Sequence, residues 1–297
     1  MEAQGEALTT AGTTWRRQSV WSQAASAQKR EIRRARSLLL ALGIAAAALG
    51  TASGQLMGPV PWLGRACAVA AAFAAAGLPF ATGRCGSQAL ADWTRLRAVS
   101  ESLKSEVYVS LAGAGRYRTA PSEAETRLRG RLIELELHAS DLARHLQGVE
   151  PLARPLPPVR GFDDYVRERV VQQVLGYYRP QSLVMRSRTT LLRRLEVALA
   201  LVGTLQGALA GGFGIAQLGV WIAVVTTIAT AVTAHAAAGR YAYQEIEYSR
   251  TAQELEALRL SGPSSTSDIV EQDRFIARCE DVISVQNDAW MVKWAGA

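Results

Sequence analysis

Two long windows that are almost free of charge constrain this chain more than any other feature. Residues 37–83 contain one charged residue, Arg65, and residues 197–239 contain none. One bilayer crossing needs about 20 apolar residues, so each window is about twice the length of a single span. Residues 54–65 (GQLMGPVPWLGR) interrupt the first window, and the glycine-rich residues 211–214 (GGFG) interrupt the second. The pattern predicts two hairpins, with spans at residues 37–57 and 66–83, then at 197–210 and 215–239.

Basic residues predict how the hairpins are oriented. Counted within about 20 residues of the hairpin ends, there are seventeen Lys and Arg, whereas the two turns hold only Arg65. We therefore expect both termini and the middle of the chain in the cytoplasm, with both hairpins in the membrane. This topology also accounts for most of the net charge of +7. A nucleic-acid partner is not expected, because the basic clusters border membrane spans and are not interleaved with aromatic residues.

The chain divides into segments by composition. Residues 1–14 are small and polar and are predicted to be disordered; residues 15–149 hold the first hairpin and its flanking helices. Residues 150–161 (EPLARPLPPVRG) contain four of the ten prolines and are predicted to be a linker. Residues 162–297 hold the second hairpin and the C-terminal helices. The hairpins resemble a duplication, because LGTASG at residues 49–54 recurs as VGTLQG at 202–207.

Outside the windows the apolar periodicity is helical, and the predicted fold class is all-α. A helix that opens at Pro121 is expected to carry a coiled-coil seam through Leu128, Leu132, Leu135, Ala139, Leu142 and Leu146. A last helix from Asp268 repeats Ile269, Ile276, Ile283 and Trp290 every seven residues. Such a stripe needs a partner, and residues 240–260, expected to continue the fourth span, are the nearest candidate.

Small and polar residues inside the spans suggest two kinds of contact. Glycines spaced four apart, which allow helices to approach closely in a bilayer, occur at Gly50 and Gly54 and again at Gly203 and Gly207. Closure of each hairpin on itself is favoured over contact between subunits. Thr226, Thr230 and Thr233 share one face of the fourth span. They are candidate pore-lining residues, although bonding to a neighbouring helix or to their own preceding turn is the more common role of such threonines.

No pattern of residues suggests catalysis, a cofactor or a metal site. Glu134, His138, Asp141 and His145 fall on one helical face, but no second ligand-bearing element is evident, so a solvated face is the better interpretation. The spans lack Asp, Glu and Lys, which argues against an ion-coupled transporter, and His235 is expected at the interface. The protein is therefore not expected to be an enzyme.

Three stretches around the hairpins resemble a known group of bacterial membrane domains. They are WTRLRAVSESLK at residues 93–104, DYVRERVVQQ at 164–173 followed by Tyr177 and Tyr178, and CEDVISVQNDAW at 279–290. Together they resemble the SLATT superfamily, two-span domains associated with nucleotide-second-messenger synthases and SLOG sensors, some of which occur in tandem in uncharacterised families.

The resemblance implies a function without catalytic residues. SLATT domains are proposed to perforate membranes in anti-phage or inter-bacterial conflict, so we expect an oligomeric effector that depolarises the membrane on a cytoplasmic trigger. Four spans of small residues enclose no evident polar channel, so a pore would need several copies. A sensor or synthase of a nucleotide second messenger is a possible cytoplasmic partner. The alternative is a passive anchor or scaffold that recruits a partner through its cytoplasmic helices.

Overall fold

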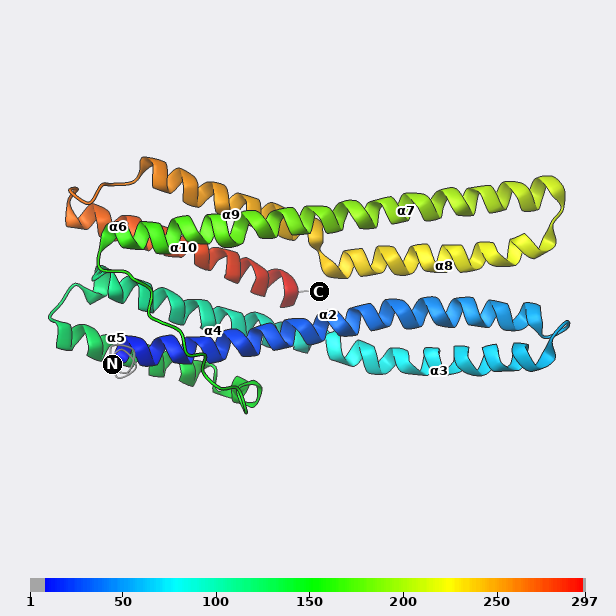
Figure 1. Ribbon diagram of the computed structural model, residues 1–297, viewed down its shortest axis with the longest axis horizontal. Helices are drawn as coiled ribbons and strands as arrows, with labels where there is room; N and C mark the ends of the chain where they lie inside the picture. The colour runs from blue at the N-terminus through cyan, green and yellow to red at the C-terminus, as the bar shows by residue number, and fades with distance from the viewer. Residues whose placement is uncertain (1–8, 296–297) are drawn as a thin grey trace. The chain divides into compact units, whose positions relative to one another are not determined.

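The computed structural model describes the backbone of residues 9–295, except that the side chains of Ala216, Gln217 and residues 285–295 are not described. The chain is 86% helical, and no β-strand occurs between residues 9 and 295 (Figure 1). The elements, in chain order, are α2 (Thr10–Leu56), α3 (Pro61–Cys85), α4 (Ser87–Leu111), the 3-10 turn η1 (Gly115–Tyr117), α5 (Pro121–His138), the 3-10 turn η2 (Ser140–His145), α6 (Phe162–Tyr165), the π-helical η3 (Val166–Val171) and η4 (Val174–Tyr178), α7 (Arg179–Phe213), α8 (Ala216–Gly239), α9 (Tyr241–Ser261) and α10 (Ile269–Ala295).

Four helical stretches are long and apolar enough to cross a membrane, in agreement with the predicted all-α fold of two tandem hairpins. Their apolar windows lie almost wholly on the surface, since no more than 11% of any window is buried. Water would make so much exposed apolar surface costly, whereas hydrocarbon does not. The chain is therefore a multi-pass membrane protein.

The turns of the hairpins are shorter than the sequence suggested. The first turn is confined to residues 57–60, because Pro61 supplies the first residue of α3, where a missing N–H is harmless. In the second, Gly211 and Gly212 remain helical in α7, and only Gly214, at φ +67°, adopts the left-handed conformation. Sequence had assigned both glycines to the break. Neighbouring apolar residues continue the helix through them.

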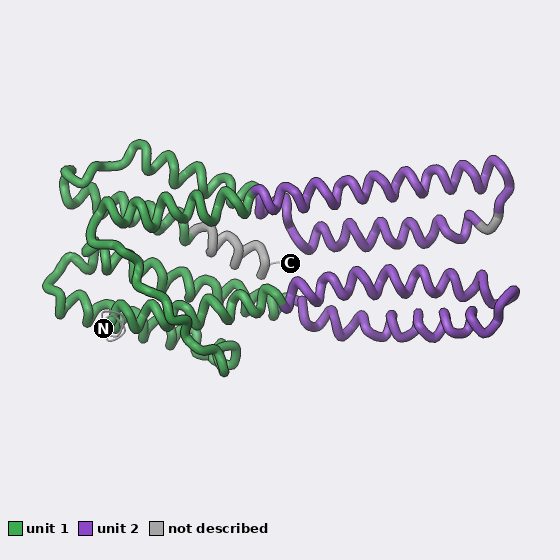
Figure 2. Tube along the Cα trace, viewed as in Figure 1, with its two compact units in different colours: residues 1–30, 87–182, 246–297 green, residues 31–86, 183–245 purple. Residues whose placement is uncertain are grey.

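The chain forms two compact units, coloured separately in Figure 2. Unit 1 contains Met1–Arg30, Ser87–Ser182 and Ile246–Ala297; unit 2 contains Glu31–Gly86 and Leu183–Glu245. Unit 2 thus holds both hairpins, and unit 1 holds the helices that precede, separate and follow them. A non-helical residue marks each exit from a hairpin. Gly86 separates α3 from α4, and Arg240, in the left-handed conformation, separates α8 from α9, where sequence had suggested a continuous helix.

Residues 10–14 are helical, which corrects the predicted disorder of residues 1–14 for this part. The Thr9 hydroxyl accepts a hydrogen bond from the N–H of Gly12 and so caps the start of α2. Thr10 and Thr14 are buried in unit 1. Residues 1–8 lie outside the described part of the chain.

The predicted seam of α5 ends earlier than expected. Leu128 and Leu142 are buried and Leu135 is half-buried, but the helix stops at His138, and Leu142 lies in η2. A single coiled-coil helix through Leu146 is therefore wrong. Instead α5 packs along α4, whose Leu96, Leu103 and Val107 are fully buried.

The stripe of α10 packs on α4, and not on residues 240–260 as the sequence suggested. Ile276 and Ile283 are 3% and 2% exposed, whereas Ile269 is 51% exposed and lies outside the packed seam. Trp290 belongs to the part of α10 whose side chains are not described. Adjacency along the chain had favoured α9, but α10 packs along α4.

The proline-rich segment 150–161 is fixed against the start of α2. The Trp15 indole N–H donates to the Pro155 carbonyl at 2.9 Å, and the Arg154 guanidinium lies 3.7 Å from the centre of the Trp15 ring. The N–H of Leu152 donates to the Ser19 hydroxyl. These contacts tie the segment into unit 1.

Candidate functional site

Unit 1 has a buried cluster of charged residues at its centre. Arg169, on η3, donates from Nε and Nη2 to the two carboxylate oxygens of Glu280 on α10, at 2.9 and 2.7 Å. Its Nη1 lies 3.8 Å from Oε2 of Glu101 on α4. The Arg169 side chain is 1% exposed. One guanidinium therefore connects three segments that are far apart in the sequence.

Charge pairing keeps this cluster ionised in spite of its burial. Burial tends to raise the pKa of Glu280, but the Arg169 guanidinium outweighs it and holds that pKa below its usual value. Burial likewise opposes ionisation of Glu101, and Lys104, Arg97 and Arg169 together lower its pKa. Burial lowers the pKa of Lys104 to about 8, although Glu101 acts in the opposite direction.

Tyrosines surround the cluster and extend it to α9. The Tyr165 hydroxyl donates to Glu280 at 2.8 Å, and burial is the first cause that raises the Tyr165 pKa. Arg97 donates to the Tyr177 hydroxyl, whose ring packs edge-on against Tyr248 of α9. The cluster thus stabilises the packing of four segments: α4, η3 with η4, α9 and α10.

Sequence reasoning missed this cluster, although its members stand in the quoted stretches. Arg169 and Glu280 are 111 positions apart, and a charged residue in an amphipathic helix is usually solvated, so nothing in the spacing pairs them. The sequence held one indication of the pair: residues 164–173 and 279–290, which resemble the same family, each carry a charged residue beside apolar neighbours.

The structure places the four predicted membrane glycines differently from expectation. Gly50, Gly54 and Gly207 have no neighbouring helix close enough for an added Cβ to touch, and only Gly203 approaches its partner helix, with Val225 at 3.7 Å. Close approaches in the first hairpin occur instead at Gly64, where a Cβ would lie 2.9 Å from Met57 Cα, and at Gly77, where it would lie 3.0 Å from Leu42 Cδ1. Within one chain the hairpins therefore do not close on Gly50, Gly54 or Gly207, and helix packing through the glycine pairs stays a prediction.

Thr226, Thr230 and Thr233 are all exposed on α8. Thr226 and Thr230 donate to the carbonyl oxygens one turn earlier, those of Ile222 and Thr226. The Thr233 hydroxyl instead donates to Glu196 of α7 at 2.9 Å. Glu196 directly precedes the uncharged window and was missed as part of this face. The four residues, named here the polar stripe, lie in a hairpin whose other residues are mostly apolar.

The acidic and histidine residues near η2 are used in ion pairs. Asp141 binds Arg95 of α4 through both oxygens, and His145 lies 3.1 Å from Asp92 of α4. Glu134 pairs with Arg131 within α5. The expected local pair therefore holds for Glu134, and His138 is exposed as on a solvated face, whereas Asp141 and His145 contact α4. No group of residues suited to a metal ion occurs in the described chain.

Four lipid-exposed helical stretches in two hairpins, joined to a helical unit with a charged centre, define an all-α multi-pass membrane protein. Residues 165–290 match the family model of the SMODS and SLOG-associating 2TM effector domain 1, and the resemblance to SLATT domains is thereby confirmed. The matched region includes Arg169, the second hairpin and Glu280. Residues 19–125 match the model of a protein family of unknown function, DUF4231. No curated protein and no solved structure matches the chain.

Proposed function

We propose that the protein is a non-enzymatic effector of the bacterial inner membrane that assembles into oligomers and permeabilises the bilayer on a cytoplasmic trigger. The setting is anti-phage defence or another bacterial conflict. The match of residues 165–290 to an effector domain supports the membrane-effector role. The observation that carries the permeabilising mechanism is the polar stripe, whose three threonines are exposed on α8 and whose Glu196 is half-buried on α7.

The hydrogen bonds of the stripe suit a surface that meets lipid in one state and water in another. Because Thr226 and Thr230 donate to their own helix, no hydroxyl donor is left unpaired in hydrocarbon. Their oxygens remain on the surface and can accept hydrogen bonds from water. A single hairpin cannot enclose a channel, so several copies would have to turn this face inward.

The trigger would act on unit 1, where Arg169 connects α4, η3 and α10. The helical stretch from Phe162 to Phe213 is continuous, so the segment that carries Arg169 leads directly into the third span. A partner that carries or senses a nucleotide second messenger is our candidate for the trigger. Release of α10 would remove the Glu280 contacts that hold Arg169, and with it the start of that helical stretch, in place.

Ion leakage from proteoliposomes tests the mechanism. The full chain, reconstituted at increasing protein density, should release potassium and depolarise vesicles. Conversion of Thr226, Thr230 and Thr233 together to Val keeps their shape and removes the polar lining, so the flux should fall on the order of tenfold. Thr204→Val is the matched control, because Thr204 is also exposed and bonded to its own helix but lies on α7.

Equal flux in the triple variant and the wild type would exclude the stripe as the lining. Absence of leakage at every density, together with unchanged membrane potential on overexpression in cells, would favour the anchor or scaffold. One observation supports that second candidate: Ile133 and Leu137, one turn apart on α5, are 52% and 67% exposed and could bind a partner helix.

A further inference from the structure

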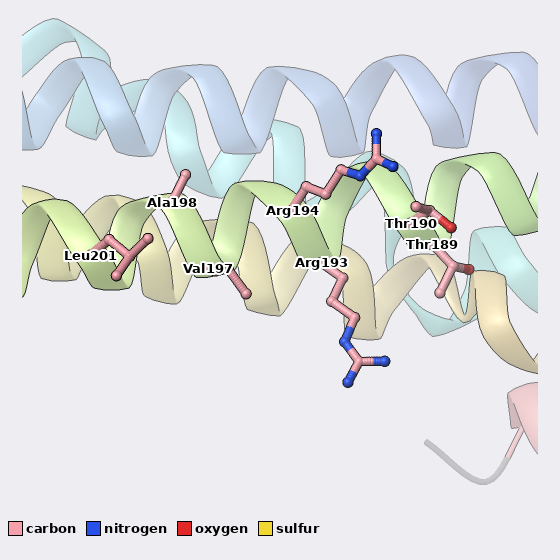
Figure 3. Close-up of a pocket in the computed structure, with 7 residues that line it drawn as sticks. All are labelled: Thr189, Thr190, Arg193, Arg194, Val197, Ala198 and Leu201. Atoms are coloured by element: carbon pink, nitrogen blue, oxygen red, sulfur yellow. The ribbon is translucent and has the colours of Figure 1, made fainter.

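A surface pocket of about 540 Å³ lies along α7, where the helix enters its apolar stretch. Figure 3 shows the seven lining residues, all from this one helix: Thr189, Thr190, Arg193, Arg194, Val197, Ala198 and Leu201. Hydroxyl and guanidinium groups occupy one end, and aliphatic side chains occupy the other. The pocket is therefore polar at one end and apolar at the other.

The two arginines carry charge that the described chain does not neutralise. No hydrogen bond or ion pair to Arg193 or Arg194 is found among the described residues. Figure 3 shows their side chains leaving α7 in diverging directions. Glu196, one turn away, accepts from Thr233 of α8 and does not line the pocket. The pocket thus offers two cationic groups to an anion from outside the chain.

The position of the pocket along the span matches a lipid–water interface. Arg194 lies 19 residues before Phe213, where α7 ends. At about 1.5 Å per residue this is about 29 Å, close to the roughly 30 Å thickness of a hydrocarbon core. The lining from Thr189 to Leu201 extends for about 18 Å, enough for a headgroup and the upper part of an acyl chain.

We propose that this pocket binds the phosphate headgroup of an anionic phospholipid. Arg193 and Arg194 supply the positive charge that attracts the phosphate, and the Thr190 hydroxyl donates to the headgroup. The Thr189 oxygen, whose proton is donated to the Met185 carbonyl, accepts from a headgroup hydroxyl, and an acyl chain lies over Val197, Ala198 and Leu201. A free anion would use only the polar end and leave the aliphatic end exposed. The apolar half therefore favours lipid over inorganic phosphate or a nucleotide.

Native mass spectrometry of the full chain in a neutral detergent tests the proposal. Titrated phosphatidylglycerol should bind at a saturable site, and phosphatidylcholine should bind more weakly. One arginine beside an anionic headgroup contributes about 1 kcal/mol, or about fivefold in affinity, so Arg193→Gln with Arg194→Gln should raise the Kd about 30-fold. Arg33→Gln with Arg34→Gln is the matched control: it removes the same charge from an exposed pair that precedes the first hairpin. Its effect should be less than about twofold, because that pair lines none of the pockets described for this part of the chain.

Two further arms separate lipid from a free anion. Leu201→Asn should weaken phosphatidylglycerol binding, and millimolar inorganic phosphate should not displace the lipid. Displacement by phosphate, or a Leu201→Asn variant that binds like wild type, would assign an anion site and overturn the lipid proposal. Equal losses in the two arginine pairs would show diffuse charge attraction and would overturn it as well. Circular dichroism confirms that each variant is folded, and Thr189→Val with Thr190→Val, which keeps both charges, should still weaken binding severalfold.

Discussion

Arg169 shows how one side chain can decide the packing of a whole unit. It makes two hydrogen bonds to Glu280 and lies near Glu101. Each of these charges needs an opposite charge close by, because all three side chains are largely buried. Such an ion pair adds little net stability compared with apolar residues of the same size, but loss of one partner leaves a buried charge uncompensated. The cluster therefore favours one arrangement of the helices over others.

Arg169→Met should lower the free energy of unfolding of unit 1 by about 3–5 kcal/mol, because Glu280 and Glu101 lose their shared counter-ion. Arg169→Met combined with Glu280→Met removes both charges and should recover a large part of that loss. Thermal unfolding of the detergent-solubilised protein, followed by circular dichroism, measures both. If the two single effects simply added in the double variant, the proposed coupling would be absent.

The buried Cys279 thiol should make the free energy of unfolding depend on pH. Burial is the main cause that raises its pKa to about 12, and the neighbouring Glu280 adds to the shift. Because the folded pKa exceeds the unfolded one, the thiol stabilises the fold fully below about pH 8.5, and this contribution is lost as the pH rises toward 12. The stability advantage of wild type over Cys279→Ala should thus be constant from pH 6 to 8 and shrink by about 1.4 kcal/mol per unit above pH 9. An advantage that stays constant to pH 10.5 would show that the thiol is not held protonated.

At the scale of elements, the sequence predicted which helices have an apolar face better than it predicted the surroundings against which each face packs. The hairpins followed from hydropathy, since a span interacts mainly with lipid and needs no particular partner. The stripe of α10 predicted a packed face at Ile276 and Ile283, which are buried. A spacing of seven residues does not identify the helix against which that face packs. The break after His138 and the π-helical turns before Arg179 depend on tertiary contacts that leave no clear local pattern. The Arg169–Glu280 pair was hidden for the same reason.

Ile276→Asp with Ile283→Asp should detach α10 from α4, because two carboxylates would enter an apolar seam at a cost of several kcal/mol. Trypsin should then cleave after Arg274 and Arg278 much faster than in wild type. Ile269→Asp with Val270→Asp is the control on the same helix, since both residues are more than half exposed. Similar cleavage rates in the two double variants would contradict the packing of α10 described above.

At the scale of the whole molecule, the compact units cut across the order of the chain. Unit 1 joins segments from before, between and after the hairpins, which is possible only if these segments lie on one side of the membrane. The even number of spans in each hairpin meets this requirement. The units were not evident from the sequence, because composition separates apolar from polar segments but does not say which polar segments pack together.

Reporter fusions should place the segments between and after the hairpins on the same side of the membrane. A reporter after Gly161 and one after Ala297 should both be active in the cytoplasm, and a tag between Gly58 and Pro61 should be accessible from outside, as the basic flanks predict. A Gly161 reporter that is active only outside the cytoplasm would contradict the two-hairpin topology.

The most direct test of the permeabilising mechanism is modification of single cysteines during current recording in planar bilayers. In a chain with Cys67, Cys85 and Cys279 replaced by Ala, Thr226→Cys and Thr230→Cys place thiols on the polar stripe, and Val224→Cys and Val232→Cys place them on the buried face of α8. A charged water-soluble thiol reagent should block current through the two threonine-site variants and leave the two valine-site variants conducting. Block at the buried face, or conduction that modification at neither threonine site alters, would contradict the assignment of this stripe to the ion path.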